Sequence, residues 1–344
     1  MMARGWVRQT LAAAVALVAL SAPAAGQSVE DFYKGKGKQI LIIVGTGVGQ
    51  DYDIWARLIG RHWGRHIPGN PTFIAQNMPG AGHLIATNHL YNVAPKDGSV
   101  LGAISRNIPN QAAMKLPNVR FDSTKFNWIG SPELTNRGCF AMADAPVKTA
   151  QEMFEKELIV GGVGAGQAVT TTPQMLKNLL GMKFKIVEGY GQPDDIVLAM
   201  ERGEVHGMCE TITGFDETRR DWLRPGKVRM LFNMEQGPVP GMPEVPTVYQ
   251  FVKTEEQRRI LNFYSASIEL GRPILAPPNV PADRVEALRR GFDATMADAA
   301  FLQEAKTMGL NVTSRTGEEL AAIVQGVMET PQDLIEKAEE MIRR

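Results

Sequence analysis

The strongest constraint on the fold of this chain is a short pattern that occurs twice: an apolar strand, a glycine-rich loop and the start of an amphipathic helix. In the first copy, an apolar run at 39–44 leads into Gly-Thr-Gly-Val-Gly-Gln at 45–50, and apolar positions then recur at helical spacing. In the second, residues 157–160 lead into Gly-Gly-Val-Gly-Ala-Gly at 161–166 and another helix. Because strands that alternate with helices form helix-covered sheets, the pattern predicts an α/β protein with two such units.

The same alternation of apolar runs and turn residues extends along most of the chain. The further elements that it predicts are strands at 72–75 and 99–104 and helices at 83–93, 282–308 and 317–344. We expect the last helix to break near Pro331, because proline removes a helical hydrogen bond. The segment after Gly226 is rich in proline, and we interpret it as a connection rather than a disordered linker.

The first 26 residues have the three-part layout of a secretory signal peptide. Arg4 and Arg8 precede an apolar run at 11–20, and small residues follow it. The run is too short to span a bilayer, which takes about 20 residues. We expect cleavage after Ala24 or Gly26 and export to the periplasm; an ordinary buried N-terminal helix is the alternative.

Charge is balanced over the whole chain, with 37 Lys and Arg against 37 Asp and Glu. That balance excludes the large positive surface of a nucleic-acid-binding protein. Removing residues 1–26 takes away two arginines and no acid, which leaves 35 basic against 37 acidic residues. Because a slightly acidic protein does not attract anions through its overall field, any anion site must depend on local donors.

The chain has two cysteines, Cys139 and Cys209, which are too few for a disulfide scaffold. An oxidising compartment allows a disulfide between them, and two separate buried thiols are the alternative. The sequence leaves both open, because it does not give the Cα separation.

Each glycine-rich loop leads into a helix N-terminus, where unpaired N–H groups and a partial positive charge attract anions. Two such loops facing each other across a cleft would suit a small carboxylate, whereas a tight turn that binds nothing is the alternative for each loop. A dinucleotide does not fit, because Gln50 stands where the fingerprint requires its third glycine, and we expect no cofactor.

Other motifs with chemical meaning are weak. His62 and His66 are four residues apart, as in some metal sites, but no third ligand lies nearby, so we expect no metal. Neither cysteine lies in a nucleophile motif and no G-x-S-x-G elbow occurs, so we expect no enzyme activity. An exported hydrolase would need a nucleophile, a base and an orienting group in one cleft.

Several short motifs, in one order, resemble those of the substrate-binding proteins of the tripartite tricarboxylate transporter family, the Bug-type receptors. Residues 74–101 contain Asn-Met-Pro-Gly-Ala-Gly and Asp-Gly, which resemble that family's N-x-P-G-A-G and D-G signature. Residues 53–57 resemble its D-x-x-A-R stretch, and 188–191 and 198–207 its Y-x-G and L-x-x-G-x-V segments. Pro246-Thr247 and the last two helices complete a similarity that extends over the mature chain.

This resemblance implies a two-lobed periplasmic-binding-protein fold of the type II, Venus-flytrap kind, each lobe a sheet flanked by helices. We place one lobe at 27–130 plus 251–344 and the other at 131–250. The implied function is that of an extracytoplasmic, monomeric solute-binding protein. It would capture a small di- or tricarboxylate or aromatic acid between the lobes for the membrane subunits of a transporter. A sensory binding protein that presents its closed form to a membrane kinase is the alternative.

The resemblance also implies which residues contact the ligand, through two loops and the turn after the second strand. These are Thr46, Gly47, Gly49, Gln50, Asp51, Tyr52, Gly80, Ala81, Gly82, Gly164, Gly166, Gln167 and Thr170. Asp51 adds a negative charge beside an anion site, so it faces solvent, caps the helix, or meets an amine on the ligand. Arg106 could offset the charge of Asp51 by pairing with a carboxylate. The alternative interpretation is that Arg106 is a solvated surface arginine.

Overall fold

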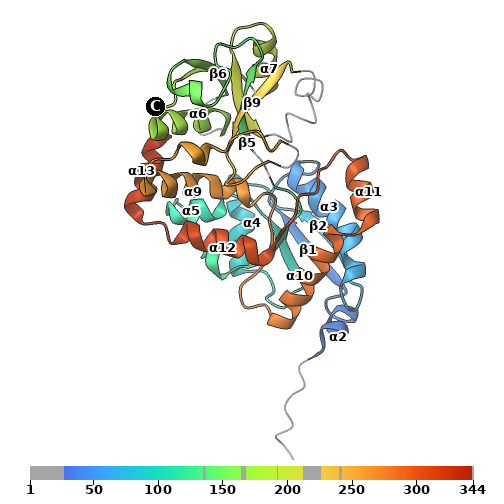
Figure 1. Cartoon of the computed structure of the whole chain (residues 1–344). Helices are drawn as coiled ribbons and strands as arrows, with labels where there is room; N and C mark the ends of the chain where they lie inside the picture. The colour runs from blue at the N-terminus through green and yellow to red at the C-terminus, as the bar shows by residue number, and fades with distance from the viewer. Residues whose placement is uncertain are drawn as a thin grey trace, which may run out of the picture.

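The computed structural model describes residues 27–134, 137–163, 168–191, 193–211, 226–239 and 242–342 of the chain. It contains two sheets with helices on their faces, one above the other in Figure 1. The expected signal peptide at 1–26 and the second half of the second glycine loop, 164–166, together with Gln167, lie outside the described residues.

The first sheet has six strands in the order β11-β4-β10-β3-β1-β2. Their bounds are β1 (Gln39–Val44), β2 (Thr72–Asn77), β3 (Val100–Ala103), β4 (Asn127–Ser131), β10 (Ile274–Ala276) and β11 (Arg315–Thr316). Strand β1 pairs in parallel with β2 and β3, and β10 is antiparallel to both β3 and β4. The carboxyl ends of β1 to β4 therefore lie at one edge, where β10 begins.

The second sheet has five strands in the order β7-β6-β8-β5-β9. Their bounds are β5 (Arg137–Met142), β6 (Leu158–Gly162), β7 (Phe184–Glu188), β8 (Gly207–Thr211) and β9 (Val228–Asn233). Strand β6 is parallel to β7 and β8, whereas β5 is antiparallel to β8 and β9. Hence β5 begins at the edge where the other four strands end.

Helices cover both sheets (Figure 1). Their bounds are α2 (Val29–Lys34), α3 (Asp51–Trp63), α4 (Leu84–Asn92), α5 (Ile108–Ala113), α6 (Ala168–Leu180), α7 (Pro193–Glu201), α9 (Glu255–Glu269), α10 (Ala282–Met296), α11 (Ala299–Thr307), α12 (Gly317–Met328) and α13 (Gln332–Met341). Side chains of β1 alternate between two cores: Ile42 packs with α3 and α10, and Ile43 with α4 and α12.

The chain passes between the sheets more than once. After the second sheet, α9 packs on that sheet's core before the chain returns to the first sheet as β10. From β11 and α12 the chain then goes back, since Leu334 of α13 shares a core with Ile260 of α9, Leu176 of α6 and Leu158 of β6. Figure 1 shows α9, α12 and α13 bridging the two sheets along one side.

The structure confirms most elements predicted from apolar periodicity, including the first strand, the helix of each glycine-loop unit and the break near Pro331. The single helix predicted at 282–308 is wrong. It is divided into α10 and α11 at Asp298, whose carboxylate accepts hydrogen bonds from the N–H groups of Ala300 and Phe301 and so begins a new helix. The proline-rich connection also contains a strand, β9.

Of the two alternatives for the cysteines, a disulfide or two separate thiols, the structure contains the disulfide. Cys139 of β5 lies directly opposite Cys209 of β8 in an antiparallel pair, and the two cysteines are bonded. Both side chains are fully buried between the second sheet and its helices. The antiparallel register, which the sequence alone does not give, is what brings the two sulfur atoms together.

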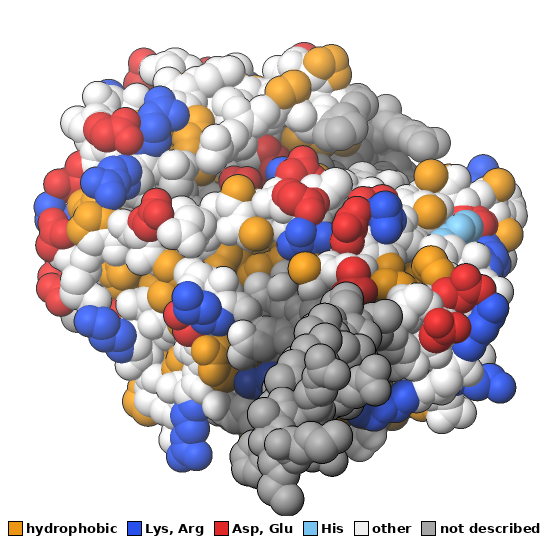
Figure 2. Space-filling model, turned by 90° about the horizontal axis from the view of Figure 1, so that it is seen from below, with side chains coloured by type: hydrophobic (Ala, Val, Ile, Leu, Met, Phe, Trp, Pro, Cys, Tyr) orange, Lys and Arg blue, Asp and Glu red, His pale blue; other side chains and the backbone are white. Residues whose placement is uncertain are grey.

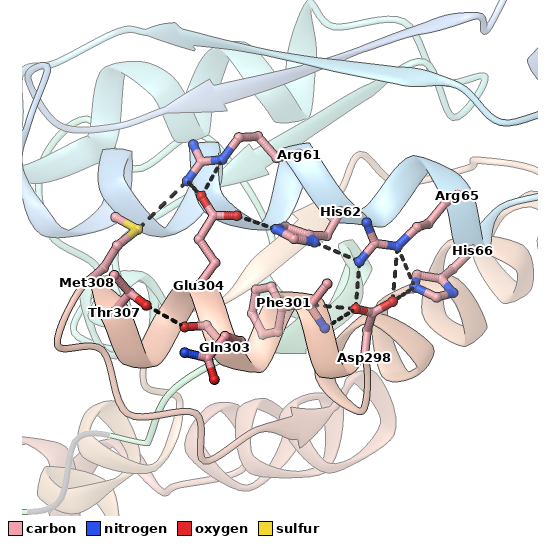
Figure 3. A network of polar contacts seen from close by, with 11 residues as sticks. Arg61, His62, Arg65, His66, Asp298, Phe301, Gln303, Glu304, Thr307 and Met308 are labelled. Atoms are coloured by element: carbon pink, nitrogen blue, oxygen red, sulfur yellow. Dashed lines mark hydrogen bonds and ion pairs between the residues drawn. The ribbon is translucent and has the colours of Figure 1, made fainter.

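The two histidines of the discounted metal motif have different carboxylate partners (Figure 3). His62 lies 2.5 Å from Glu304 and His66 lies 2.9 Å from Asp298, both on or beside α11. Arg65 adds an ion pair of 2.6 Å with Asp298. Within the described ranges, no group of three or more His, Cys, Asp or Glu side chains could hold a metal ion. These contacts fasten α11 to the end of α3.

Removing the Asp298 carboxylate is expected to lower the free energy of unfolding by about 1 kcal/mol at pH 7, the usual cost of losing a helix cap. The hydrogen bond from Arg65 is the main cause that lowers the pKa of Asp298. A lowered pKa stabilises the fold above the pKa of the unfolded chain, about 3.9, and the benefit is lost as the pH falls below it. Urea denaturation of Asp298→Ala should show a difference that shrinks below about pH 4.

The matched control is Asp298→Asn, which keeps a cap acceptor but removes the charge. It should retain the larger part of the stability at pH 7 and show a weaker pH dependence. A full loss in Asp298→Asn would mean that the ion pairs, and not the cap, hold this corner together.

Charged side chains of both signs are interspersed over the face of the molecule seen in Figure 2. That distribution agrees with the balanced composition. It gives this face no region of one sign that would gather anions, so an anion site has to be built from local groups.

Candidate functional site

The residues predicted to contact a ligand gather at the carboxyl ends of the strands. The first glycine loop follows β1, the Gly80–Gly82 turn follows β2, and Arg106 follows β3. From the second sheet, Arg137 begins β5 at the matching edge and Thr170 lies in the first turn of α6. Ligands of open α/β sheets bind at this end of the strands, because helix N-termini and loops converge there.

Side chains within the first glycine loop already occupy several of its N–H groups. Gly47 N–H donates to Gln50 Oε1 at 3.0 Å, and Gly49 N–H donates to Asp53 Oδ2 at 2.8 Å. Tyr52 N–H donates to Asp51 Oδ1 at 2.8 Å. In this arrangement the loop offers fewer free amides than the sequence pattern led us to expect.

Asp53 explains why the D-x-x-A-R stretch accompanies the loop. Arg57 Nε donates to its carboxylate at 2.9 Å, and Asn77 Nδ2 links Asp53 at 2.9 Å to the Thr46 carbonyl at 3.0 Å. Burial alone would raise the pKa of Asp53, but hydrogen bonds from Arg57, Gly49 and Asn77 lower it overall. The carboxylate stays ionised and fixes the loop, so its role is structural.

The turn after β2 has an unusual backbone. Gly80, Ala81, Gly82 and His83 have φ values of 137°, 47°, 60° and 74°. A Cβ on Gly80 would lie 2.5 Å from Ile85 Cδ1, so glycine is required there. The turn directs the His83 ring edge-on to Tyr52, with centroids 4.9 Å apart.

His83 is a neutral imidazole in this site. Burial lowers its pKa to about 4, against the weaker opposing effect of Asp51. Its Nδ1 is buried and has no hydrogen-bond partner within the described part of the chain. The Thr46 hydroxyl oxygen is likewise buried and has no hydrogen-bond partner among the described residues. Both are buried neutral polar groups whose hydrogen-bonding capacity the described residues leave unused.

Asp51 forms an ion pair that the sequence reading did not consider. Arg272 Nη2 lies 2.9 Å from Asp51 Oδ2, and the same guanidinium lies over the Tyr52 ring, 5.2 Å from its centroid. Arg272 precedes β10, far from the loop in sequence. Glu133 lies 4.0 Å from Arg272 Nε and accepts a hydrogen bond from Trp55 Nε1 at 3.0 Å. The loop's negative charge is thus neutralised before any ligand arrives.

Two arginines from other segments, Arg272 and Arg137, act electrostatically on the Arg106 guanidinium. Arg106 is half-buried, and burial lowers its pKa, with Arg272 and Arg137 contributing in the same direction. Arg137 is only 5% exposed; its Nη1 donates to Thr172 Oγ1 at 3.2 Å, and its Nε is buried without a partner among the described residues. Like charges held together under low exposure favour binding of an anion.

The backbone N–H of Arg106 donates to Tyr52 Oη at 3.1 Å, and this hydrogen bond connects the end of β3 to α3. The Arg106 side chain is half-buried, so it is not a fully exposed surface arginine. Thr170 is 6% exposed and lies against the end of β6. Gly164, Gly166 and Gln167 lie outside the described residues. Their contacts with a ligand, like those of the other residues predicted, stay a prediction.

Sequence reasoning missed Arg137, Arg272 and His83. Arg137 begins an antiparallel strand and Arg272 precedes one, so their position at this edge of the sheets depends on strand direction, which apolar periodicity does not reveal. His83 stands directly after the Pro-Gly-Ala-Gly turn, and that position was the available signal in the sequence.

No helix in the described ranges is long and apolar enough to cross a membrane. No curated protein matches the chain in sequence. Residues 65–339 match the tripartite tricarboxylate transporter family receptor.

Solved structures of similar fold include a TctC solute-binding protein from Polaromonas without ligand, with a TM-score of 0.69 at 18% identity, covering 87% of this chain and 98% of that one. The periplasmic binding protein BugD has a TM-score of 0.56 at 21% identity, covering 88% and 97%. MatC from Rhodopseudomonas palustris with bound malate has a TM-score of 0.53 at 19% identity, covering 89% and 99%.

At these identities the structures establish the two-lobed fold, in which two helix-flanked sheets face each other. The family match extends over most of the chain and includes every strand of both sheets except β1. The chain therefore belongs to the tripartite tricarboxylate transporter family of receptors and is a solute-binding protein.

Proposed function

We propose that this receptor captures a small carboxylate anion between its two sheets. The observation that carries the proposal is the cluster of Arg106, Arg137 and Arg272, which unites groups from both sheets at the carboxyl ends of their strands. Asp51 and Glu133 offset part of that charge. The remaining positive charge suits one or two carboxylates better than a neutral solute.

The neutral groups of the cleft suit the rest of such a ligand. Tyr52 supplies a buried aromatic wall, and the Thr46 hydroxyl and His83 Nδ1 can hydrogen-bond polar oxygens. That MatC holds malate is in keeping with this chemistry. The glycine-loop amides contribute once their present side-chain partners give way to the ligand.

We further propose that the protein acts in the periplasm as a monomer and delivers its ligand to the membrane subunits of a transporter. Residues 1–26 would serve as the export signal. The lobes would comprise 27–130 plus 251–344 and 131–250. The family match supports transport over sensing, and measuring solute uptake separately from transcription in a deletion strain distinguishes the two.

Thermal melting against malate, citrate, benzoate and malamide tests the binding proposal. A bound acid present at 100 times its dissociation constant should stabilise the fold by about 2.7 kcal/mol. Malamide, the neutral diamide of malate, should have no effect, because it has no charge for the arginines. The proposal would be contradicted if no acid changed the melting temperature relative to the protein alone, provided that native mass spectrometry shows the protein to hold no ligand beforehand.

A further inference from the structure

The Arg272 side chain is held in place by the residues around it. The backbone N–H of Arg272 donates to Ser131 Oγ at 2.8 Å, and the preceding Gly271 has a φ of +61°. A Cβ on Gly271 would lie 1.7 Å from the Glu133 carbonyl oxygen, so only glycine permits this close approach. The guanidinium lies over the Tyr52 ring, 5.2 Å from its centroid. Backbone and ring together fix the position of the guanidinium.

This position belongs to the candidate site. Tyr52 Oη accepts the backbone N–H of Arg106 at 3.1 Å, while the ring of the same tyrosine lies against Arg272. One side chain therefore contacts the segments that carry both arginines. Tyr52 lies in the first turn of α3, directly after the first glycine loop. The Arg272 guanidinium thus lies beside the loop for which we propose carboxylate binding.

Two carboxylates lie near this guanidinium, and they differ in how firmly they are held. Asp51 Oδ2 is 2.9 Å from Arg272 Nη2, whereas Glu133 Oε2 is 4.0 Å from Nε. Glu133 is buried and accepts a hydrogen bond from Trp55 Nε1 at 3.0 Å. The Asp51 side chain is 50% exposed, against 15% for the side chain of Arg272. The closer of the two acids is thus the one that can turn into water.

Replacing Asp51 at the guanidinium by another carboxylate costs little free energy. A partly exposed ion pair contributes little, because water solvates the ions almost as well. Asp51 is also the first residue of α3, and a helix N-terminus favours a carboxylate there with or without Arg272. Arg272 is mostly buried, so it gains more than Asp51 does from a new partner of opposite charge.

We propose that Asp51 is an internal competitor of the ligand: its carboxylate occupies the Arg272 guanidinium and gives way to a carboxylate of the ligand. This inference rests on the proposed carboxylate binding and adds a limit to its affinity, because each ligand has to displace Asp51. A neutral solute offers no charge in exchange, so the same contact disfavours the binding of such solutes.

Isothermal titration calorimetry of Asp51→Asn, with malate, citrate and benzoate as probes, tests the proposal. The variant keeps the size of the side chain and removes its charge. The acid that binds the wild type best should bind the variant roughly threefold to tenfold more tightly. The matched control is Glu286→Gln, which removes the acid of an exposed ion pair with Arg290 and should leave the affinity unchanged. Equal or weaker binding by Asp51→Asn would overturn the proposal.

A crystal structure of the wild type with the same acid separates exchange of carboxylates from simple repulsion between charges. A ligand carboxylate should lie within hydrogen-bond distance of Arg272, and Asp51 should have turned away from it. If the contact between Asp51 and Arg272 persisted beside the bound acid, the proposal would be wrong even if Asp51→Asn bound more tightly. Only the failure of every acid to bind both proteins would contradict the proposed function itself.

Discussion

Replacing both cysteines by alanine is expected to lower the free energy of unfolding by about 4 kcal/mol. The disulfide joins Cys139 of β5 to Cys209 of β8 across a sequence separation of 70. In the chain-entropy account, a bond that closes so long a loop removes much of the freedom of the unfolded chain and so favours the native state. Urea denaturation of the wild type and of Cys139→Ala/Cys209→Ala measures the difference.

A reducing agent supplies the matched control, because the protein has two cysteines in all. Under TCEP the wild type should approach the stability of the double variant, and the double variant itself should not change. The residual difference between the two reduced proteins measures the packing lost with the buried sulfur atoms. Equal stability of the two proteins without reductant would contradict a stabilising disulfide.

Arg137→Gln is expected to weaken binding of the best acid in the thermal panel by ten- to a hundredfold. Loss of a hydrogen bond to a charged group costs about 1.5–3 kcal/mol, which corresponds to this change in the dissociation constant. Arg137 is buried at the start of β5, and in the site we propose its guanidinium would approach the ligand from the second sheet. Isothermal titration calorimetry measures the change directly.

Two variants separate charge from geometry in this prediction. Arg137→Lys keeps the positive charge but not the planar donor fork, so its affinity should lie between those of the wild type and Arg137→Gln. Arg290→Gln removes an exposed arginine of α10 that pairs with Glu286, and binding should be unaffected. If Arg290→Gln weakened binding as much as Arg137→Gln, overall charge rather than the cleft would explain the effect.

The sequence predicted the fold better than it predicted the site. Apolar periodicity located β1, the helix α3 and the turn at Gly80, because these features depend on neighbours close in the chain. The break at Asp298 was missed, since the cap replaces helical hydrogen bonds without interrupting the apolar pattern. The predicted loop contacts lie at the carboxyl edge of the first sheet and stay a prediction, and they did not foresee that Gln50 and Asp53 occupy loop amides.

Only the tertiary structure decided the electrostatics of the cleft. Asp51 lies next to Arg272, and Arg137 approaches Arg106, because antiparallel strands bring residues distant in sequence to one edge. The same holds for the paired cysteines. The sequence by itself determined the two strand–loop–helix units and the family motifs. Which charges face one another depends on strand direction and register, and those depend on contacts between segments that no local pattern records.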